Sequence, residues 1–388
     1  MFLYFLHHLN RVKIATTEAE KEAIYRLRYQ SFIIEMNKNN IENVDHERKM
    51  IKDVDDDKPG NILIYIGPFD APKATARLTI YQPNKVPKEI SKRYTLDEYP
   101  EFKDKKLAEV SRLTICAQHR KGTMLLSLVN TLYKISAKEN VDIALLYTTP
   151  GLCKFYCKFG YRHYQSHTIR TSDGIRIAMI NILSDINFYT KVNSPLKKLV
   201  KKYYGRGKNR VLNLETLSSR IQDSNCTPKN QTEYIYNKLM NQTENSKSKL
   251  SEFMKNLTRS DLDHIVKHSI IMNAKEGDII YTEGLIEKEV YIVLSGSLTI
   301  QSQQNSILNK IETGDIFGEI SFFTNSGERT GTVTANNNCE LLMLSRKFVH
   351  KIAIDNPTLA MKLLFNMANV LATEFCSNQY QYKKLQVI

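Results

Sequence analysis

The chain has 388 residues, of which 42% are hydrophobic, and it carries a formal net charge of +14. This length predicts two domains of ordinary size, and the apolar content excludes a disordered chain. No apolar run approaches the roughly 18 residues of a membrane span and the six cysteines lack metal-ligand spacing, so we expect a cytoplasmic protein with reduced thiols, no membrane span and no metal site.

Residues 12–185 alternate helical and strand patterns with few breakers, which predicts an α/β domain. Thr17 begins a Thr-x-x-Glu capping box, so we expect a helix from there to about Glu35. Strands are expected over residues 61–66, 73–81, 107–116 and 141–147, and helices over 125–132 and 152–158. This alternation is the order expected of a cofactor-binding α/β unit.

Residues 186–250 are polar and basic, and their apolar periodicity is weak. They predict a linker with one or two helices. Eight Lys or Arg and no Asp or Glu lie between Lys191 and Arg210. A solvated linker and a docking patch for an acidic partner both explain this charge.

Residues 251–388 contain short strands separated by glycines and then one strong helix, which predicts a β-roll of jelly-roll type closed by a helix. Asn356 and Pro357 have the residue types of an N-cap and a first helical position. An apolar stripe then runs from Leu359 to Phe375. Core packing alone explains this stripe as well as a contact surface does.

Within that region, the segment from Gly314 to Ala335 contains side chains suited to a cyclic nucleotide. Such a ligand presents a ribose 2′-hydroxyl, which suits a buried carboxylate such as Glu319, and one anionic cyclic phosphate. A guanidinium such as Arg329 and free backbone N–H groups suit the phosphate. Gly318 lets the backbone approach the ligand closely.

This segment resembles the phosphate-binding cassette of cyclic-nucleotide-binding domains, such as those of bacterial catabolite activators and protein kinase regulatory subunits. The upstream runs 276–284 and 290–297 resemble the first hairpin and the next strand of that family. The resemblance implies that Glu319 holds the ribose hydroxyl and that Arg329 pairs with the phosphate of cAMP or cGMP. The other pocket residues that it implies are Phe317, Gly318, Ile320, Ser321 and Thr330. A degenerate copy of the fold that no longer binds a nucleotide is the alternative.

In that family the closing helix covers the base or forms a dimer seam, so the resemblance also implies a homodimer through the C-terminal helix. Transcription factors of the family carry a helix-turn-helix after this helix, for which the sequence leaves no room. We therefore expect no DNA binding.

Three short motifs occur in order in the N-terminal half: Leu27–Phe32, Ala76–Leu78 and Ala108–Leu113. With the acidic run Asp53–Asp57, they resemble acyl-homoserine-lactone synthases and long-chain N-acyl amino acid synthases of the GNAT acyltransferase superfamily. The run Cys153–Tyr161 resembles a general element of GNAT enzymes. The resemblance implies substrate contacts from Arg28, Phe32 and Arg77, although surface ion pairs explain the two arginines equally well.

Acyl transfer from a thioester to an amine requires a deprotonated amine, a stabilised carbonyl oxygen and a protonated leaving thiolate. Glu109 is the candidate base and Tyr156 the candidate acid, although Tyr156 also suits a core position. Backbone N–H groups from Leu113 to Cys116 are candidates to hold the oxyanion. Arg112 joins this catalytic group only if a bulge places it on the face of Glu109, because residues three apart on a regular strand face opposite ways.

GNAT enzymes hold the pyrophosphate of acyl-CoA with a Gln/Arg-x-x-Gly-x-Gly/Ala loop. The corresponding run here, His119–Met124, keeps one glycine and lacks the second. The residues expected to bind the donor are Leu113, Ile115, Arg120, Lys121, Gly122 and Thr123. The missing glycine leaves the donor open between acyl-CoA or acetyl-CoA and acyl carrier protein, an acidic partner that suits the basic run 191–210.

The sequence therefore predicts an N-acyltransferase that is regulated by a cyclic nucleotide and that acylates the amine of a small molecule. A protein-lysine acetyltransferase gated by a cyclic nucleotide is one alternative. A non-catalytic cyclic-nucleotide sensor that acts through protein partners is another.

Overall fold

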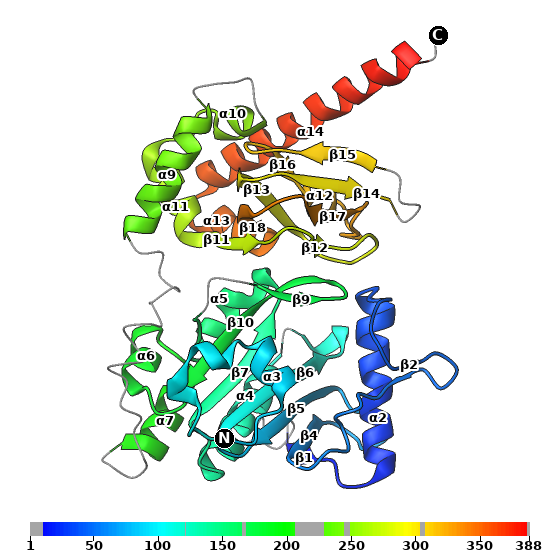
Figure 1. Ribbon diagram of the computed structural model, residues 1–388, viewed down its shortest axis with the longest axis vertical. Coiled ribbons are helices and arrows are strands. Elements are labelled where there is room, and N and C mark those ends of the chain that lie inside the picture. Colours follow the sequence, from blue (N-terminus) through cyan, green and yellow to red (C-terminus); the bar gives the residue numbers. More distant parts are fainter. Residues whose placement is uncertain are drawn as a thin grey trace. The chain divides into compact units, whose positions relative to one another are not determined.

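The computed structural model describes residues 11–120, 122–164, 168–205, 229–243, 249–302 and 307–385. The chain divides into two compact units, whose helices and strands are labelled in Figure 1. Unit 1 comprises Met1–Gln165 and Arg176–Asn225, and unit 2 comprises Ser166–Ile175 and Cys226–Ile388.

Unit 1 is an α/β domain, as the alternating patterns predicted. Its sheet has the strand order β1-β4-β5-β6-β7-β10, and β8 also pairs with β10. The strands are β1 (Val12–Ile14), β4 (Asn61–Ile66), β5 (Ala74–Tyr81), β6 (Leu107–Ile115), β7 (Ile143–Thr148), β8 (Tyr161–His163) and β10 (Gly174–Ile182). Strands β4 and β5 form the predicted antiparallel hairpin, whereas β6 and β7 are parallel.

The three helices that the sequence predicted for unit 1 begin within one residue of the predicted positions, at Glu18, Met124 and Cys153. Thr17 and Glu20 form the capping box of α2 (Glu18–Tyr29), which continues as a π-helical segment, Gln30–Glu35. Helix α4 (Met124–Lys138) is the crossover that the parallel strands β6 and β7 require. The other elements are β2 (Val44–Asp45), β3 (Met50–Ile51), α3 (Lys88–Arg93), α5 (Cys153–Cys157), α6 (Ile186–Lys191) and α7 (Lys197–Tyr204).

The parallel pair of β6 and β7 opens partway along its length. The two strands pair only where Leu107–Glu109 lies against Ile143–Leu145, and β6 then continues to Ile115. Where the two strands diverge, the backbone N–H and C=O groups that face the gap form no hydrogen bonds between β6 and β7. These groups can therefore bind other partners.

Unit 2 contains two antiparallel sheets, which confirms the predicted C-terminal β-sheet domain. Their strand orders are β12-β17-β14-β15 and β11-β18-β13-β16. The strands are β11 (Ile270–Ala274), β12 (Ile279–Tyr281), β13 (Glu289–Ser295), β14 (Leu298–Gln301), β15 (Ile307–Ile311), β16 (Ile316–Phe317), β17 (Thr332–Ala335) and β18 (Cys339–Ser345). Strand β9 (Ile169–Thr171) also belongs to unit 2.

The predicted closing helix of unit 2 is α14 (Pro357–Leu385). The Asn356 side chain accepts a hydrogen bond from the Leu359 N–H at 3.1 Å, which confirms the N-cap. Leu359 and Leu363 are buried in the core of unit 2, but Phe375 of the predicted stripe is exposed. The other helices are α9 (Lys229–Thr243), α10 (Lys249–Met254), α11 (Arg259–His268), α12 (Glu319–Phe323) and α13 (Arg346–Asp355).

The segment 186–250 has more helix than the one or two helices predicted for it. Its described residues contain α6, α7, α9 and the start of α10. Val200 and Tyr204 of α7 and Ile235 and Leu239 of α9 are buried. A few well-spaced apolar residues therefore suffice to anchor helices whose overall periodicity is weak.

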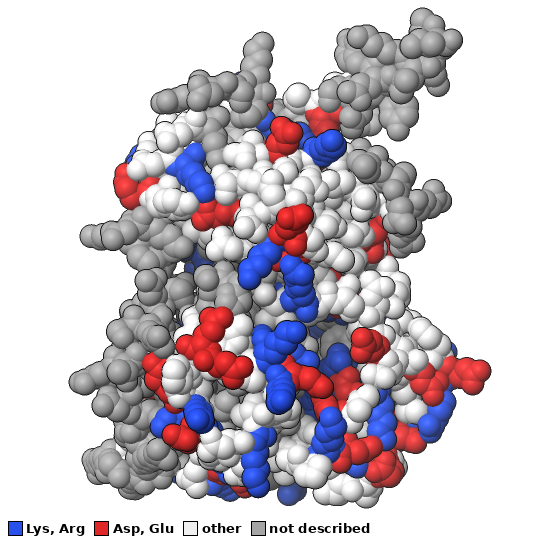
Figure 2. All heavy atoms as spheres, viewed as in Figure 1, with Lys and Arg blue, Asp and Glu red and all other residues white. Residues whose placement is uncertain are grey.

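Among the described residues, one helix, Pro357–Cys376, is long and apolar enough to cross a membrane by length and composition alone. No such run was expected from the sequence, and a helix from a protein core has the same length and composition, so these two properties do not identify a membrane span. On the face shown in Figure 2, acidic and basic side chains are intermixed, so the positive net charge is not gathered there into one patch.

Candidate functional site

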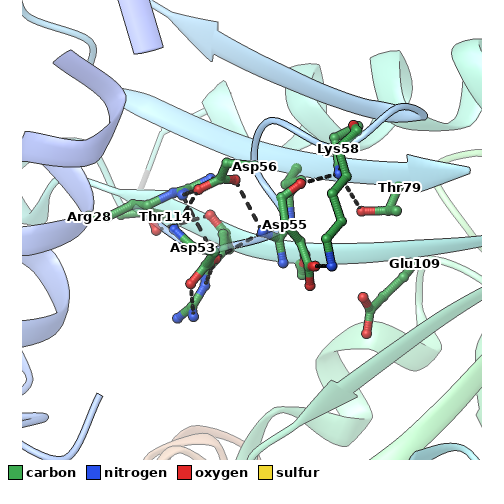
Figure 3. A network of polar contacts seen from close by, with 12 residues as sticks. Arg28, Asp53, Asp55, Asp56, Lys58, Thr79, Glu109 and Thr114 are labelled. Atoms are coloured by element: carbon green, nitrogen blue, oxygen red, sulfur yellow. Dashed lines mark hydrogen bonds and ion pairs between the residues drawn. The ribbon is translucent and has the colours of Figure 1, made fainter. Parts of the chain in front are cut away.

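Three arginines and two aspartates meet in unit 1 (Figure 3). Arg28 of α2 donates to both carboxylate oxygens of Asp56, at 2.6 and 3.2 Å. Arg77 of β5 bridges Asp53 and Asp56, at 2.9 and 3.1 Å. Arg112 of β6 donates to both oxygens of Asp53, at 2.7 and 2.6 Å. The formal charge of this Arg–Asp network (Arg28, Arg77, Arg112, Asp53 and Asp56) is +1.

One end of the Arg–Asp network is buried, and the other, which we call its open end, is partly exposed to solvent. The side chains of Arg28 and Asp56 are wholly buried, whereas that of Arg112 is 25% exposed. Although burial acts in the opposite direction, Arg112 and then Arg77 hold the pKa of Asp53 below its usual value. The interpretation of Arg28 and Arg77 as surface ion-pair partners is therefore wrong, because both are buried.

The π-helical segment after α2 places Phe32 beside the open end. The guanidinium of Arg112 lies 5.6 Å from the centroid of the Phe32 ring. Short π-helical turns are frequent at functional sites. The three predicted substrate residues, Arg28, Phe32 and Arg77, thus all belong to the Arg–Asp network or border it.

A bulge in β6 places Glu109 and Arg112 on one face. Strand β6 has one extra residue against β5 at this point, and Arg112 adopts a φ of 53°. Val110 and Leu113 line the same cavity although they are three positions apart, so Glu109 and Arg112 face the other way. Figure 3 nevertheless shows Glu109 set apart from the Arg–Asp network.

Glu109 is buried and is held by residues that the sequence analysis did not select. Its carboxylate accepts hydrogen bonds from the hydroxyls of Tyr94, at 2.6 Å, and Tyr81, at 3.5 Å. Arg93 lies 3.4 Å away. Burial, and then the charge of Glu109, raise the pKa of Tyr94, which keeps its hydroxyl protonated as a donor. No sequence motif links these partners, because they come from separate segments.

Tyr156 lines an apolar cavity with Leu113, next to the divergence of β6 and β7. Other lining residues are Val110, Val129, Leu132, Leu146 and Phe159. Burial raises the pKa of Tyr156 to about 12, so its hydroxyl is protonated near neutral pH. Glu109 and Tyr156 therefore approach β6 from opposite faces.

In the loop predicted to bind the acyl donor, the side chain of Arg120 already has partners within the protein. Arg120 pairs with Glu35 and donates to the Ile115 carbonyl at 3.0 Å. The Gly122 N–H donates to the His119 carbonyl at 3.1 Å, just before Thr123 and the start of α4. Lys121 lies outside the described residues.

The carboxylate predicted to hold a ribose is buried at the start of α12 in unit 2. Gly318, with a φ of 84°, precedes Glu319. Burial raises the pKa of Glu319 to about 7. Its Oε2 atom has no hydrogen-bond partner among the described residues, so a ligand hydroxyl would satisfy a buried acceptor.

The arginine predicted to bind the phosphate, Arg329, is also buried. Arg329 Nη1 donates to the Glu289 carbonyl at 2.8 Å and to the Ser321 hydroxyl at 2.7 Å. The guanidinium lies 3.9 Å from the centroid of the Tyr281 ring. In the described part of the chain, Arg329 Nε and Nη2 have no hydrogen-bond partner, so these donors are left for an anion.

The remaining predicted pocket residues divide into two groups. Phe317 is buried and stacks on Tyr291, with ring centroids 5.0 Å apart. Gly318 and Ser321 contact Arg329. Ile320 and Thr330 are exposed. Two carboxylates that no sequence motif indicated, those of Glu287 and Glu289, have Oε2 atoms 3.9 and 3.7 Å from Arg329 Nη2.

Comparisons with protein families agree with both halves of this description. The model of the N-acyl amino acid synthase FeeM family matches residues 23–175, and that of the cyclic nucleotide-binding domain matches residues 271–356. The two predicted resemblances are thereby confirmed. The chain thus combines a region similar to the N-acyl amino acid synthase FeeM family with a region similar to cyclic nucleotide-binding domains.

Individual relatives are similar to part of the chain. The cAMP-activated global transcriptional regulators CRP of Salmonella typhimurium and Klebsiella aerogenes are each 26% identical over 118 residues, which cover 29% of this chain and 56% of theirs. The chain thus spans about half the length of the curated relatives that it matches.

Two solved structures are also similar. A cyclic nucleotide-binding domain from Methylobacillus flagellatus is 18% identical, with a TM-score of 0.34, and the match covers 39% of this chain and 83% of that one. The Thermus thermophilus catabolite activator protein is 22% identical, with a TM-score of 0.31 and coverages of 35% and 63%.

Proposed function

We propose that unit 1 transfers an acyl group from a thioester donor to the amine of an amino acid, in the manner of GNAT enzymes, and that cyclic-nucleotide binding to unit 2 changes the rate of this transfer. The observation that carries the proposal is the position of Glu109, a buried and hydrogen-bonded carboxylate where β6 parts from β7. A base at this point has access to a donor in the gap between the strands.

The reaction follows from the groups on the two faces of β6. Glu109 accepts a proton from the acceptor ammonium, directly or through a water. The free amine attacks the thioester carbon, and backbone N–H groups of β6 from Leu113 to Ile115 hold the developing oxyanion. The Cys116 N–H of the predicted set already donates to the Lys73 carbonyl at 3.0 Å. The carbon–sulfur bond breaks, and the leaving thiolate takes a proton from Tyr156. The nitrogen of the new amide loses its extra proton to water, and a proton from water restores the Tyr156 hydroxyl. The apolar cavity beside Leu113 suits the acyl chain.

The charge of the Arg–Asp network favours an amino acid over a protein lysine as the acceptor. The network has a net charge of +1, and its open end carries Arg112. A free amino acid presents a carboxylate that this end would bind, whereas a lysine within a protein chain has none beside its amine. Phe32, next to Arg112, would contact the acceptor side chain.

For the donor we favour acyl carrier protein over acyl-CoA. Arg120 is already paired with Glu35, which weakens the case for a pyrophosphate site at this loop. The carrier is acidic, and Lys198, Lys201 and Lys202 of α7 are exposed. Replacing the four lysines of α7, including Lys197, by Gln should weaken carrier binding, and an unchanged affinity would refute this choice.

In unit 2 the proposal rests on two buried anchors, Glu319 for the ribose hydroxyl and Arg329 for the phosphate. Calorimetric titration of cAMP and cGMP into the full chain tests it, with Arg329→Ala as the variant that should lose binding. Thiol release with a panel of amino acids then tests the enzyme. No release with any acceptor would favour the non-catalytic sensor instead.

A further inference from the structure

The phosphate side of the nucleotide pocket contains two carboxylates for which the proposed function has no use. Glu287 and Glu289 lie 3.9 and 3.7 Å from Arg329 Nη2, and their side chains are only 12% and 17% exposed. Nη2 is also one of the two Arg329 nitrogens left for an anion. A bound phosphate would therefore lie next to this acidic pair.

The charges of the pocket oppose a phosphate when every group is ionised. Glu287, Glu289 and Glu319 together with Arg329, the cation paired with Glu287 and Glu289, give a formal sum of −2, which Lys347 of α13 offsets in part. A cyclic phosphate adds a further negative charge in a buried place, where like charges repel much more strongly than in water. Binding therefore requires that one of these carboxylates moves away or takes up a proton.

Glu289 is the group best placed to take up that proton. Its carboxylate accepts a hydrogen bond from the Lys288 backbone and faces the charges of Glu287, Arg329 and Lys347 of α13. Burial, and then the charge of Glu287, raise the pKa of Glu289 to about 7, against the lowering effect of Arg329. Protonation of this side chain near neutral pH therefore costs little free energy.

We propose that Glu289, supported by Glu287, couples nucleotide binding to proton uptake, so that the phosphate binds to Arg329 as the Glu289 carboxylate is neutralised. This inference rests on the proposed nucleotide binding. A bound phosphate raises the pKa of Glu289 further. The affinity for the nucleotide is therefore highest below about pH 7 and falls up to about tenfold for each pH unit above it. The affinity stops falling once the pH exceeds the pKa that Glu289 has in the complex.

Glu319 also has a pKa near 7, but its contribution has the opposite sign. It would accept a hydrogen bond from the ribose hydroxyl in its ionised form, so its part in binding releases a proton. The difference in proton uptake between the wild-type chain and a Glu289 variant therefore isolates Glu289.

The test is calorimetric titration of cAMP and cGMP into the full chain from about pH 6 to about pH 9, in pairs of buffers with different ionisation enthalpies. The wild-type chain should take up close to one more proton per nucleotide at about pH 8 than Glu289→Gln does. Glu289→Gln should retain binding and lose most of the pH dependence. Glu312→Gln removes an exposed carboxylate of the same unit and should keep the wild-type behaviour.

A second variant keeps the test informative if Glu289→Gln does not fold. Glu287→Gln removes the charge that raises the pKa of Glu289, so the decline in affinity should begin at a lower pH. Equal proton uptake in the wild-type chain and Glu289→Gln, or an unmoved decline in Glu287→Gln, would overturn the inference. Absence of nucleotide binding at every pH would instead refute the proposed function of unit 2.

Discussion

Arg112 holds both carboxylate oxygens of Asp53, at 2.7 and 2.6 Å, although the two residues are 59 positions apart. It does so from the bulge of β6 with a φ of 53°, a conformation that residues other than glycine seldom adopt. Strain of this kind persists where surrounding contacts compensate for it, and it is concentrated at functional sites. The Asp53–Arg112 pair is therefore the contact through which the Arg–Asp network shapes the proposed acceptor site.

Asp53→Asn should lower kcat/KM for the amino acid by about 100-fold, because a small displacement of Arg112 disturbs the position of the acceptor. Steady-state kinetics with varied amino acid measure this loss. Asp57→Asn is the matched control, since Asp57 belongs to the same acidic run but pairs with Lys52 at the surface. An equal loss in both variants would show that Asp53 has no special role.

Asp56→Asn should lower the free energy of unfolding by about 3–5 kcal/mol, because it removes the close charged partner of the wholly buried Arg28 and leaves it only Asp53, at 3.9 Å. Urea unfolding monitored by circular dichroism measures the change. Asp55→Asn, whose partner Lys58 is exposed, should unfold close to the wild-type midpoint. Equal midpoints for the two variants would contradict the burial argument.

Glu109→Gln should reduce kcat by about 10²- to 10⁴-fold and leave donor binding unchanged, because it removes the base but keeps the shape. Tyr94→Phe should cost less, because it removes the 2.6 Å hydrogen bond that orients the carboxylate but leaves the base in place. A loss of kcat with Tyr94→Phe as large as that with Glu109→Gln would contradict this division of roles.

Tyr156→Phe should slow transfer from alkyl thioesters, whose leaving thiolates need a proton, and should spare aryl thioesters, whose thiolates leave without one. In the wild-type enzyme this acid should remain active as the pH rises, because burial holds the pKa of Tyr156 at about 12. Rates with the two donor classes measure the effect. Equal slowing of both would assign Tyr156 to core packing.

Gly318→Ala should abolish nucleotide binding, because its Cβ would lie 2.6 Å from Arg329 Nη1 and 2.8 Å from the Glu289 carbonyl oxygen. Gly277→Ala is the control, since Gly277 also has a positive φ, of 78°, but no atom lies within 4 Å of its added Cβ. Both variants should lose about 1 kcal/mol of stability from backbone strain. Calorimetry should show that Gly277→Ala still binds, and a loss in both would contradict the steric account.

Features built from neighbouring residues could be predicted from the sequence. The cassette lies within one run, and its Glu319 and Arg329 are both buried, as anchors for a ligand should be. The capping box of Thr17 and the N-cap of Asn356 also depend only on local spacing. Such short-range patterns carry their own geometry.

Features that depend on distant segments could not be predicted. Nothing in the run from Asp53 to Asp57 shows that only Asp53 and Asp56 are buried in the Arg–Asp network. The bulge at Arg112 has no glycine to mark it. Tyr94 and Glu289 acquire their partners only when separate strands and loops come together.

The most direct test of the central claim is the rate of thiol release by the full chain with an amino acid acceptor, measured with and without a nucleotide at a concentration that calorimetry shows to be saturating. The account predicts that the nucleotide changes the rate of the wild-type chain, and that Arg329→Ala retains the rate without nucleotide but no longer responds. An unchanged wild-type rate with nucleotide bound would contradict the claim that unit 2 regulates unit 1.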